Sequence, residues 1–480
     1  MKKGSGVLLH ISSLPGYGIG SLGKQAFHFV DRLHEAGFSY WQILPLNPTS
    51  PYCGNSPYSS NSLIAGNRYF IDLDQFVSYG WLEQSDLEMP VCDRVDYEAV
   101  DKHRKVVLKK AFDNTTDEVK KQVAAWAKQN ESIYTYALYS AFASKFGTPW
   151  TIWPQGLKDC DKKAIKTYAK ECSDKIDQFL FEQYFFFTQF AELKKYANGK
   201  GIKIIGDMPV YASFDSADVW ANQKLFEVEG YKTNLCAGVP PDYFSKTGQL
   251  WGNPVYKIAE HKKTGYKWML DRFLMAQKFC DVLRVDHFRG YESFWAVEAG
   301  EKTAINGKWV KSFGKDLFDK LGEVSDVEII AEDLGIITPE VEKLMKDLDY
   351  PGMNILLFAY NSENSKYLPK NHLKNSVSYI GTHDNDTLVG WLNKVTDWEK
   401  ENMIKQTGYD GDYNVFFDEL FASKSDVVIV SMQDMLGLDT SYRMNVPSVP
   451  NGNWSYQMKE GEFSDELVER FSKLNEKYNR

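Results

Sequence analysis

Four short segments of the sequence place a carboxylate at or just after an apolar run. They are GDMP with Asp207, RVDHFRG with Asp286, AEDLG with Glu332 and GTHDND with Asp384. A single acidic residue in such a position more often caps a strand or opens a loop. Four of them, several beside Arg or His, favour one shared site, because converging carboxylates repel one another and lose hydration, a cost that folds tolerate where the charges have a function.

Two carboxyl groups with a third are suited to breaking and forming glycosidic bonds. An ionised carboxylate attacks the anomeric carbon, a protonated partner gives its proton to the leaving oxygen, and an acceptor then breaks the glycosyl–enzyme ester. In this retaining chemistry the two carboxyl groups lie about 5–5.5 Å apart. Arg284 precedes Asp286 by two residues. The alternation of a strand therefore points both side chains to one side, and the cation helps to keep Asp286 ionised.

Segments so distant along the chain need a frame that brings them together, and the pattern predicts an α/β fold, a (β/α)₈ TIM barrel. Short apolar runs end at Gly, Asp, Pro or His, and amphipathic segments follow them. Strands that are apolar on both faces belong in a parallel sheet covered by helices, and eight of them favour a closed barrel. The expected strands span residues 7–11, 40–44, 203–206, 282–285, 327–331, 354–358, 377–381 and 427–431.

Two stretches between these strands are too long for simple crossovers. Roughly residues 75–185, between the second and third strands, are mostly helical in pattern and predict an inserted helical subdomain. Roughly residues 288–320, between the fourth and fifth strands, form another insertion and contain Asn306-Gly307, a strong hairpin signal. No repeat or linker interrupts the sequence, so we expect a single catalytic domain over residues 1–480.

Helix boundaries are expected at two places. A helix over residues 22–36 should stop at Gly37, and Thr338 followed by Pro339 should begin a helix over residues 340–347.

The composition limits the classes of partner and the cellular location that we expect for this protein. The net charge of −9 and the pI of about 5.6 argue against nucleic acid. No stretch is long and apolar enough to cross a membrane, and the first apolar run is brief, is interrupted by His10 and favours a strand over a signal peptide. The six cysteines are scattered without metal-binding spacing, so we expect reduced thiols in a cytoplasmic protein. Aromatic residues make up 15% of the chain, and some of them could line a groove for sugars.

The segments that carry the carboxylates resemble those of the amylomaltases, the bacterial 4-α-glucanotransferases or disproportionating enzymes of glycoside hydrolase family 77. The likeness covers nearly the whole chain and includes LLHISSLPGYGIGSLG, YWQILPLNPT, SPYSSNS, GNRYFIDL, GQLWGNPVY and RMNVPSVPNGNW. It implies transfer of an α-1,4-glucan segment from a donor to the 4-hydroxyl of an acceptor, with maltooligosaccharides and α-glucans as partners and without a metal or other cofactor. We expect a monomer or a homodimer.

The resemblance also implies roles for individual residues. Asp286 matches the family nucleophile, Glu332 the general acid/base, and Asp384 the third carboxylate, which binds sugar hydroxyls at the −1 subsite. Other residues match the lining of that subsite or of the groove beside it, namely Tyr58, whose ring would stack on the −1 sugar, Asp207, Arg284, His287, His383 and Trp251.

The segment from Asp242 to Asn253 resembles the loop that folds over the acceptor side in that family. Tyr243, Phe244 and Trp251 are its aromatic residues, and we expect them to exclude water from the intermediate so that transfer outcompetes hydrolysis.

Three alternatives remain open at the level of sequence. An α-amylase-like retaining hydrolase would use the same carboxylates, and a silent glucan-binding protein would bind without turnover. The run of residues 18–23 matches G-x-G-x-x-G, but no acidic residue for a ribose follows the second expected strand, so nucleotide binding is disfavoured.

Overall fold

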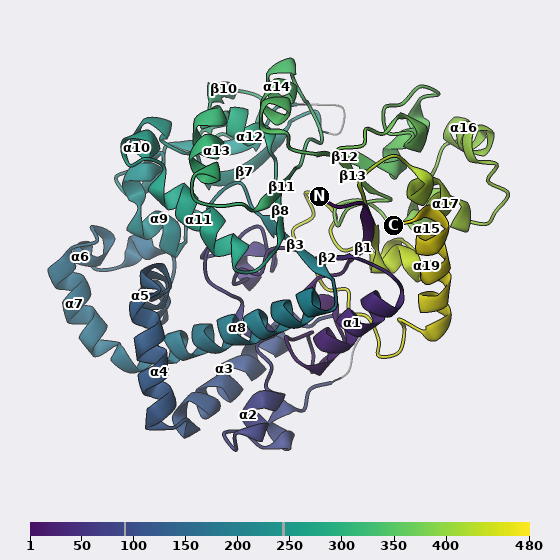
Figure 1. Ribbon diagram of the computed structural model, residues 1–480. Helices are drawn as coiled ribbons and strands as arrows, with labels where there is room; N and C mark the ends of the chain where they lie inside the picture. Colours follow the sequence, from purple (N-terminus) through teal and green to yellow (C-terminus); the bar gives the residue numbers. More distant parts are fainter. Residues whose placement is uncertain (91–92, 242–244) are drawn as a thin grey trace.

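The computed structural model describes residues 1–90, 93–241 and 245–480. At its centre is an eight-stranded parallel sheet with the order β11-β8-β3-β2-β1-β14-β13-β12. The Ala331 N–H donates to the Pro351 carbonyl at 2.9 Å, between the two ends of this order, so the sheet curls into the predicted (β/α)₈ barrel (Figure 1). The strands are β1 (Gly4–Leu8), β2 (Tyr40–Gln42), β3 (Lys203–Met208), β8 (Val282–Val285), β11 (Glu328–Ala331), β12 (Gly352–Ile355), β13 (Ser376–Tyr379) and β14 (Val427–Ser431).

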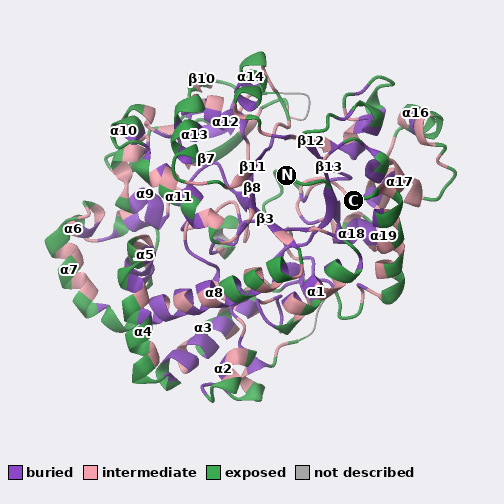
Figure 2. Cartoon of the chain, in the orientation of Figure 1, coloured by how far each residue is buried: buried purple, intermediate pink, exposed green. Residues whose placement is uncertain are grey.

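The barrel strands are buried on both faces. Every residue of β1, β8, β13 and β14 is buried, and Figure 2 shows purple strands inside a shell of helices with green outer faces. Burial of both faces is the reason that apolar and small residues make up most of these strands.

Helices follow the strands around the outside of the barrel. On α1, the buried side chains Ala26, Phe29, Val30 and Leu33 form one face, the pattern of an amphipathic helix on a sheet. The helices outside the stretch between β2 and β3 are α1 (Lys24–Glu35), α9 (Ala217–Ala221), α10 (Ile258–Lys263), α11 (Lys267–Gln277), α12 (Arg289–Glu292), α13 (Gly314–Gly322), α14 (Pro339–Leu348), α15 (Leu388–Leu392), α16 (Asp397–Thr407), α17 (Asn414–Ala422), α18 (Met432–Met435) and α19 (Asp465–Tyr478).

Both predicted helix boundaries are confirmed to within two residues. Helix α1 stops just before Gly37, whose φ of +76° suits glycine, and α14 starts at Pro339 after Thr338 in an extended conformation. Among the described residues, no helix is both long and apolar enough to cross a membrane.

The stretch between β2 and β3 is helical. Helix α8 has 27 residues, packs against α4 and α5, and leads directly into β3 (Figure 1). Aromatic side chains of α2 and α8, such as Phe76 and Phe185 with ring centroids 4.8 Å apart, fill the space between these helices. The helices are α2 (Asp74–Ser78), α3 (Tyr97–Asn114), α4 (Asp117–Lys128), α5 (Glu131–Phe146), α6 (Gln155–Lys158), α7 (Lys162–Glu171) and α8 (Ser173–Gly199).

A second, antiparallel sheet is built from segments on either side of β8. Its strands are β6 (Leu235–Val239), β7 (Gln249–Pro254), β9 (Ser293–Glu298) and β10 (Lys308–Lys311), in the order β10-β9-β6-β7. A short ribbon of β4 (Val228–Glu229) and β5 (Lys232–Thr233) precedes it. Strands β9 and β10 form a hairpin, but residues 299–307 connect them, so Asn306-Gly307 is not a two-residue turn. A Cβ at Gly307 would lie 2.2 Å from Trp295 Nε1, so this glycine serves close packing.

Two predicted strands are displaced along the chain. The first was expected at residues 7–11, but β1 spans Gly4–Leu8 and residues Ile11–Ser13 form a 3₁₀ turn. Gly6 is needed within the strand, because a Cβ there would lie 2.5 Å from the Tyr40 carbonyl oxygen of β2. The sixth was expected at residues 354–358, but β12 ends at Ile355 and a 3₁₀ helix follows.

The contact at Gly6 gives a test of barrel packing. We expect Gly6→Ala to lower the free energy of unfolding by about 1–3 kcal/mol, because the added methyl group forces β1 and β2 apart. Thermal and urea unfolding measure the change. Gly322→Ala is the matched control, since the space around Gly322 in α13 is open and alanine favours a helix. A Gly6→Ala protein as stable as this control would contradict the contact.

Candidate active site

A cavity of about 720 Å³ opens at the carboxyl ends of the barrel strands. Asp286 follows β8 directly, Glu332 follows β11 directly, and Asp384 lies in the loop after β13. All three carboxylates line this one cavity. Parallel strands end at the same rim of a barrel, so the fold brings together side chains that are far apart along the chain.

Arg284 is the cation of the site. Its Nη1 lies 2.7 and 2.8 Å from the two carboxylate oxygens of Asp207 and 3.2 Å from Asp286 Oδ1. The side chain of Arg284 is 4% exposed and that of Asp207 is fully buried. The pairing of Arg284 with Asp286 is the one that strand alternation predicts.

Asp207 does not stand in the wall of the cavity. It lies at the end of β3, which continues two residues beyond the predicted strand end, and its carboxylate is held behind the wall by Arg284 and by the Tyr58 hydroxyl, which donates to Oδ2 at 2.8 Å. A carboxylate in this position fixes Arg284 and Tyr58, and its contact with a ligand is indirect.

Burial raises the pKa of both central carboxyl groups. The pKa of Asp286 rises to about 8, because desolvation and the charges of Asp207, Glu332 and Asp384 outweigh the opposing effect of Arg284. Desolvation raises the pKa of Glu332 as well, against Arg284 and two backbone hydrogen bonds. Two interacting carboxyls that both resist ionisation retain one proton between them near neutral pH. The 3.2 Å contact with Arg284 favours the negative charge on Asp286.

Backbone N–H groups fix the orientation of Glu332. The N–H of His287 donates to Oε2 at 2.8 Å, and the N–H of Leu334 donates to Oε1 at 2.7 Å. His287 has a φ of +44°, an uncommon value for a residue with a side chain and one that costs free energy. This conformation turns the His287 N–H toward Glu332, while its ring packs edge-on against Trp251 with centroids 5.0 Å apart.

Asp384 is held differently, and its side chain is 45% exposed. The Asn445 side-chain amide donates to Oδ1 at 2.6 Å, and His383 Nε2 lies 3.4 Å from the same oxygen. Arg443 donates to the backbone carbonyl of Asp384. The exposed carboxylate is thereby fixed in place without being withdrawn from the cavity.

An aromatic group forms the wall beside Asp384. The rings of Tyr58 and His383 are stacked, with centroids 5.1 Å apart and an angle of 16°, and Trp454 packs against both. Burial lowers the pKa of His383, so its ring is uncharged near neutral pH. His383 therefore covers one face of the Tyr58 ring.

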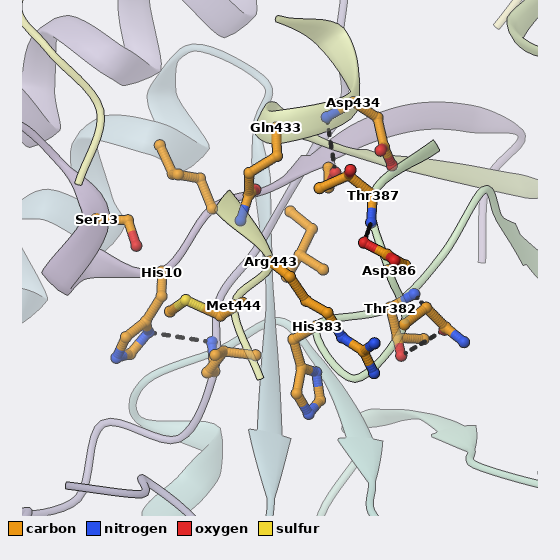
Figure 3. A pocket seen from close by; sticks show the side chains of 15 residues that line it. His10, Ser13, Thr382, His383, Asp386, Thr387, Gln433, Asp434, Arg443 and Met444 are labelled. Carbon is orange, nitrogen blue, oxygen red and sulfur yellow. Dashed lines mark hydrogen bonds between the residues drawn. The ribbon is translucent and has the colours of Figure 1, made fainter. Parts of the chain in front are cut away.

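A small cavity of about 30 Å³ lies beside His383 (Figure 3). His383 and Arg443 border it together with His10, Gln433 and Asp434. His10 Nδ1 accepts the Leu44 N–H at 3.2 Å, and burial lowers the pKa of His10 to about 3, so this second histidine is also uncharged. His383 therefore borders polar side chains on this side, and the neighbouring histidine, His10, carries no positive charge.

The predicted acceptor-side loop is described in part. Asp242, Tyr243 and Phe244 lie outside the described residues. Trp251 and Asn253 are in β7 and line the main cavity, and the Asn253 side-chain amide donates to the Ala212 carbonyl at 3.1 Å.

Two other acidic residues near the strand ends are structural. Asp333 accepts the Met353 N–H at 2.7 Å, and Asp386 accepts Lys394 at 2.6 Å and Thr440 at 3.0 Å. Among the described residues, no group of three or more His, Cys, Asp or Glu side chains is placed to hold a metal ion.

Several residues of the cavity were missed by the sequence analysis. Asn445 and Trp454 lie in the segment RMNVPSVPNGNW, which was matched as a block without roles for its members. Arg289 lies in RVDHFRG and Trp309 lies after it, and both side chains also line the cavity. The Gly- and Pro-rich composition of residues 445–453 was a signal for a surface loop, and loops of this kind often carry binding residues.

Known proteins are similar to this chain in sequence and in fold. A family model described as 4-alpha-glucanotransferase matches residues 9–463. The 4-alpha-glucanotransferase of Streptococcus pneumoniae serotype 4 is 44% identical, with 100% of this chain and 98% of the relative covered, and that of Aquifex aeolicus is 42% identical, with 95% of each covered. The solved structure of an amylomaltase from Streptococcus agalactiae in complex with acarbose is 35% identical and superimposes with a TM-score of 0.96, with 100% of both chains covered. The chain belongs to the 4-α-glucanotransferases of glycoside hydrolase family 77.

Proposed function

We propose that this protein transfers segments of α-1,4-glucan from a donor maltooligosaccharide or glucan to the 4-hydroxyl of an acceptor glucose or glucan, with retention at the anomeric carbon. The observation that carries the proposal is that Asp286, Glu332 and Asp384, from three different strand ends, line one cavity of about 720 Å³. The volume suits a ligand larger than one sugar.

In the first step, Asp286 attacks C1 of the glucose in the −1 subsite while Glu332 donates its proton to the departing 4-oxygen. The C1–O4 bond breaks, a C1–carboxylate ester forms, and the reducing-end part of the donor leaves with the proton. Asp384, held by Asn445 and open to the cavity, is placed to bind hydroxyls of the same sugar and to favour its positively charged transition state.

In the second step, the 4-hydroxyl of an acceptor attacks C1 of the ester. Glu332, now a carboxylate, removes the hydroxyl proton, the ester bond breaks and the Asp286 carboxylate returns. The same residue acts as acid and base, so the proton that Glu332 lost in the first step is restored in the second.

The charges around the pair support these assignments. Arg284, in contact with Asp286 and anchored by Asp207, stabilises a carboxylate nucleophile, while the buried Glu332 keeps a proton that a solvated glutamate would lose. A hydrolase would use the same charges. The amylomaltase of known structure and the aromatic side chains around the cavity favour a sugar acceptor over water.

Maltotriose alone tests the reaction class. We expect glucose together with a ladder of longer maltooligosaccharides, because the acceptor competes with water for the ester. Chromatographic separation of the products over time measures both. Release of glucose and maltose without longer products would indicate the α-amylase-like alternative, and binding without any product would indicate the silent glucan-binding alternative.

Substitutions at the two central carboxyls separate nucleophile from acid. We expect Asp286→Asn and Glu332→Gln each to lower maltotriose turnover by about 10³-fold or more, in line with the contribution of general acid catalysis. With α-glucosyl fluoride, whose leaving group needs no proton, Glu332→Gln should form a glycosyl adduct on Asp286 that mass spectrometry detects, and Asp286→Asn should form none. An adduct on another residue would contradict the assignment.

The pH dependence follows from the shared proton. Glu332 is an acid only while it keeps its proton, and burial raises the pKa of Glu332 above its ordinary value. We therefore expect kcat/KM for maltotriose to stay high through the pH range in which an unperturbed glutamate ionises and to fall only at higher pH. Circular dichroism at each pH controls for unfolding. A fall that began near pH 4–5, where an unperturbed glutamate ionises, would contradict the raised pKa.

A further inference from the structure

Trp309 is an exposed aromatic residue of the cavity to which neither the chemistry above nor the sequence analysis gives a role. It lies in β10, is 38% exposed, and lines the same cavity as Asp286 and Glu332. A large indole exposed in a cavity costs solvation free energy, and an amphipathic ligand such as a sugar can relieve that cost.

The indole is held rigidly by its neighbours. The Arg289 guanidinium carbon lies 3.8 Å from the centroid of the Trp309 ring and covers one face, and Trp295 packs at 5.1 Å with an angle of 64°. Arg289 is itself buried and donates to the Ile336 carbonyl. A ring fixed in this way loses little conformational entropy when a ligand stacks on it.

These contacts place Trp309 on the side of the cavity governed by Glu332. Ile336, which Arg289 binds, lies two residues after Leu334, whose N–H fixes Glu332. The acid/base residue faces the glycosidic oxygen between donor and acceptor. The donor sugar belongs beside Asp384 and the Tyr58–His383 wall, so Trp309 belongs with the acceptor.

The second sheet determines how far Trp309 lies from the catalytic pair. Trp251 is in the edge strand β7 and packs on His287, next to the catalytic pair, while Trp309 is in the opposite edge strand β10 (Figure 1). Three strand spacings separate the two edges, which amounts to roughly 14 Å. One glucose bound beside Trp251 does not extend over that distance, whereas a longer maltooligosaccharide does.

We propose that Trp309, braced by Arg289, is an outer acceptor subsite that binds a glucose unit of a maltooligosaccharide acceptor beyond the first, and thereby makes the reaction select longer acceptors over glucose. The proposal rests on the transferase function proposed above. Three observations support the proposal. Arg289 leaves one face of the Trp309 ring free, the ring is fixed by its neighbours, and Trp309 lines the same cavity as Asp286 and Glu332.

The test uses transfer from α-glucosyl fluoride to acceptors of increasing length, from glucose to maltotetraose. We expect Trp309→Ala to lower kcat/KM for maltotetraose by about tenfold, the upper range for an aromatic stacking contact. The same variant should leave transfer to glucose and the hydrolysis of the fluoride within about twofold, since these reactions do not reach the ring. Trp309→Phe keeps an aromatic face and should retain most of the preference for long acceptors.

Trp398 provides the matched control. It lies on α16, is 50% exposed, and is not among the described residues that line the cavity. Trp398→Ala should leave the whole acceptor series unchanged.

Two outcomes would overturn the subsite. An equal loss for glucose, maltotetraose and water in Trp309→Ala would mean that the ring only supports the segment around Glu332. An unchanged acceptor series would mean that sugars do not touch the ring. Neither outcome affects the proposed transferase function, which fails only if the unaltered protein makes no transfer product from any acceptor.

Discussion

The buried ion pair of Arg284 with Asp207 is the interaction on which the site depends. Three further carboxylates converge on the same barrel mouth, and the positive charge of Arg284 acts on both Asp286 and Glu332. Without a fixed guanidinium the mutual repulsion would oppose folding, and without Asp207 the guanidinium would be drawn fully onto Asp286 and weaken it as a nucleophile. A buried pair that loses one partner leaves an uncompensated charge, so both members are needed for the fold and for the electrostatics.

Much of this arrangement could be predicted from the sequence, because burial and electrostatics constrain both the residue types and the folded structure. Strands buried on two faces favour apolar residues, and the predicted runs overlap all eight barrel strands, although the first and the sixth are displaced along the chain. The carboxylates at or just after those runs located Asp286 and Glu332. Contacts between distant segments were not predictable. Asn445 gains its role only by meeting Asp384, 61 residues away along the chain, and Gly6 is part of a strand only because β2 approaches so closely. Trp309 lacked a signal of its own, since a tryptophan in a hairpin is indistinguishable from a packing residue.

The barrel and the second sheet carry different groups of the site. The barrel rim holds the groups that react, on strands that are buried and rigid, whereas β7 and β10 present Trp251 and Trp309 on the two edges of a sheet inserted around β8. Reaction type and acceptor choice therefore reside in different layers of the molecule, and the acceptor layer can vary without disturbing the barrel, as in other enzymes of this architecture.

The way in which the barrel closes affects Glu332. The two ends of the strand order meet at the hydrogen bond from Ala331 to Pro351, and Glu332 is the next residue after Ala331. A joint with few backbone hydrogen bonds opens at a lower free-energy cost than a full ladder. Glu332 thus follows the joint between β11 and β12, while Asp286 follows β8, which is paired with a strand on each side. Loosening of that joint would displace Glu332 and leave Asp286 in place.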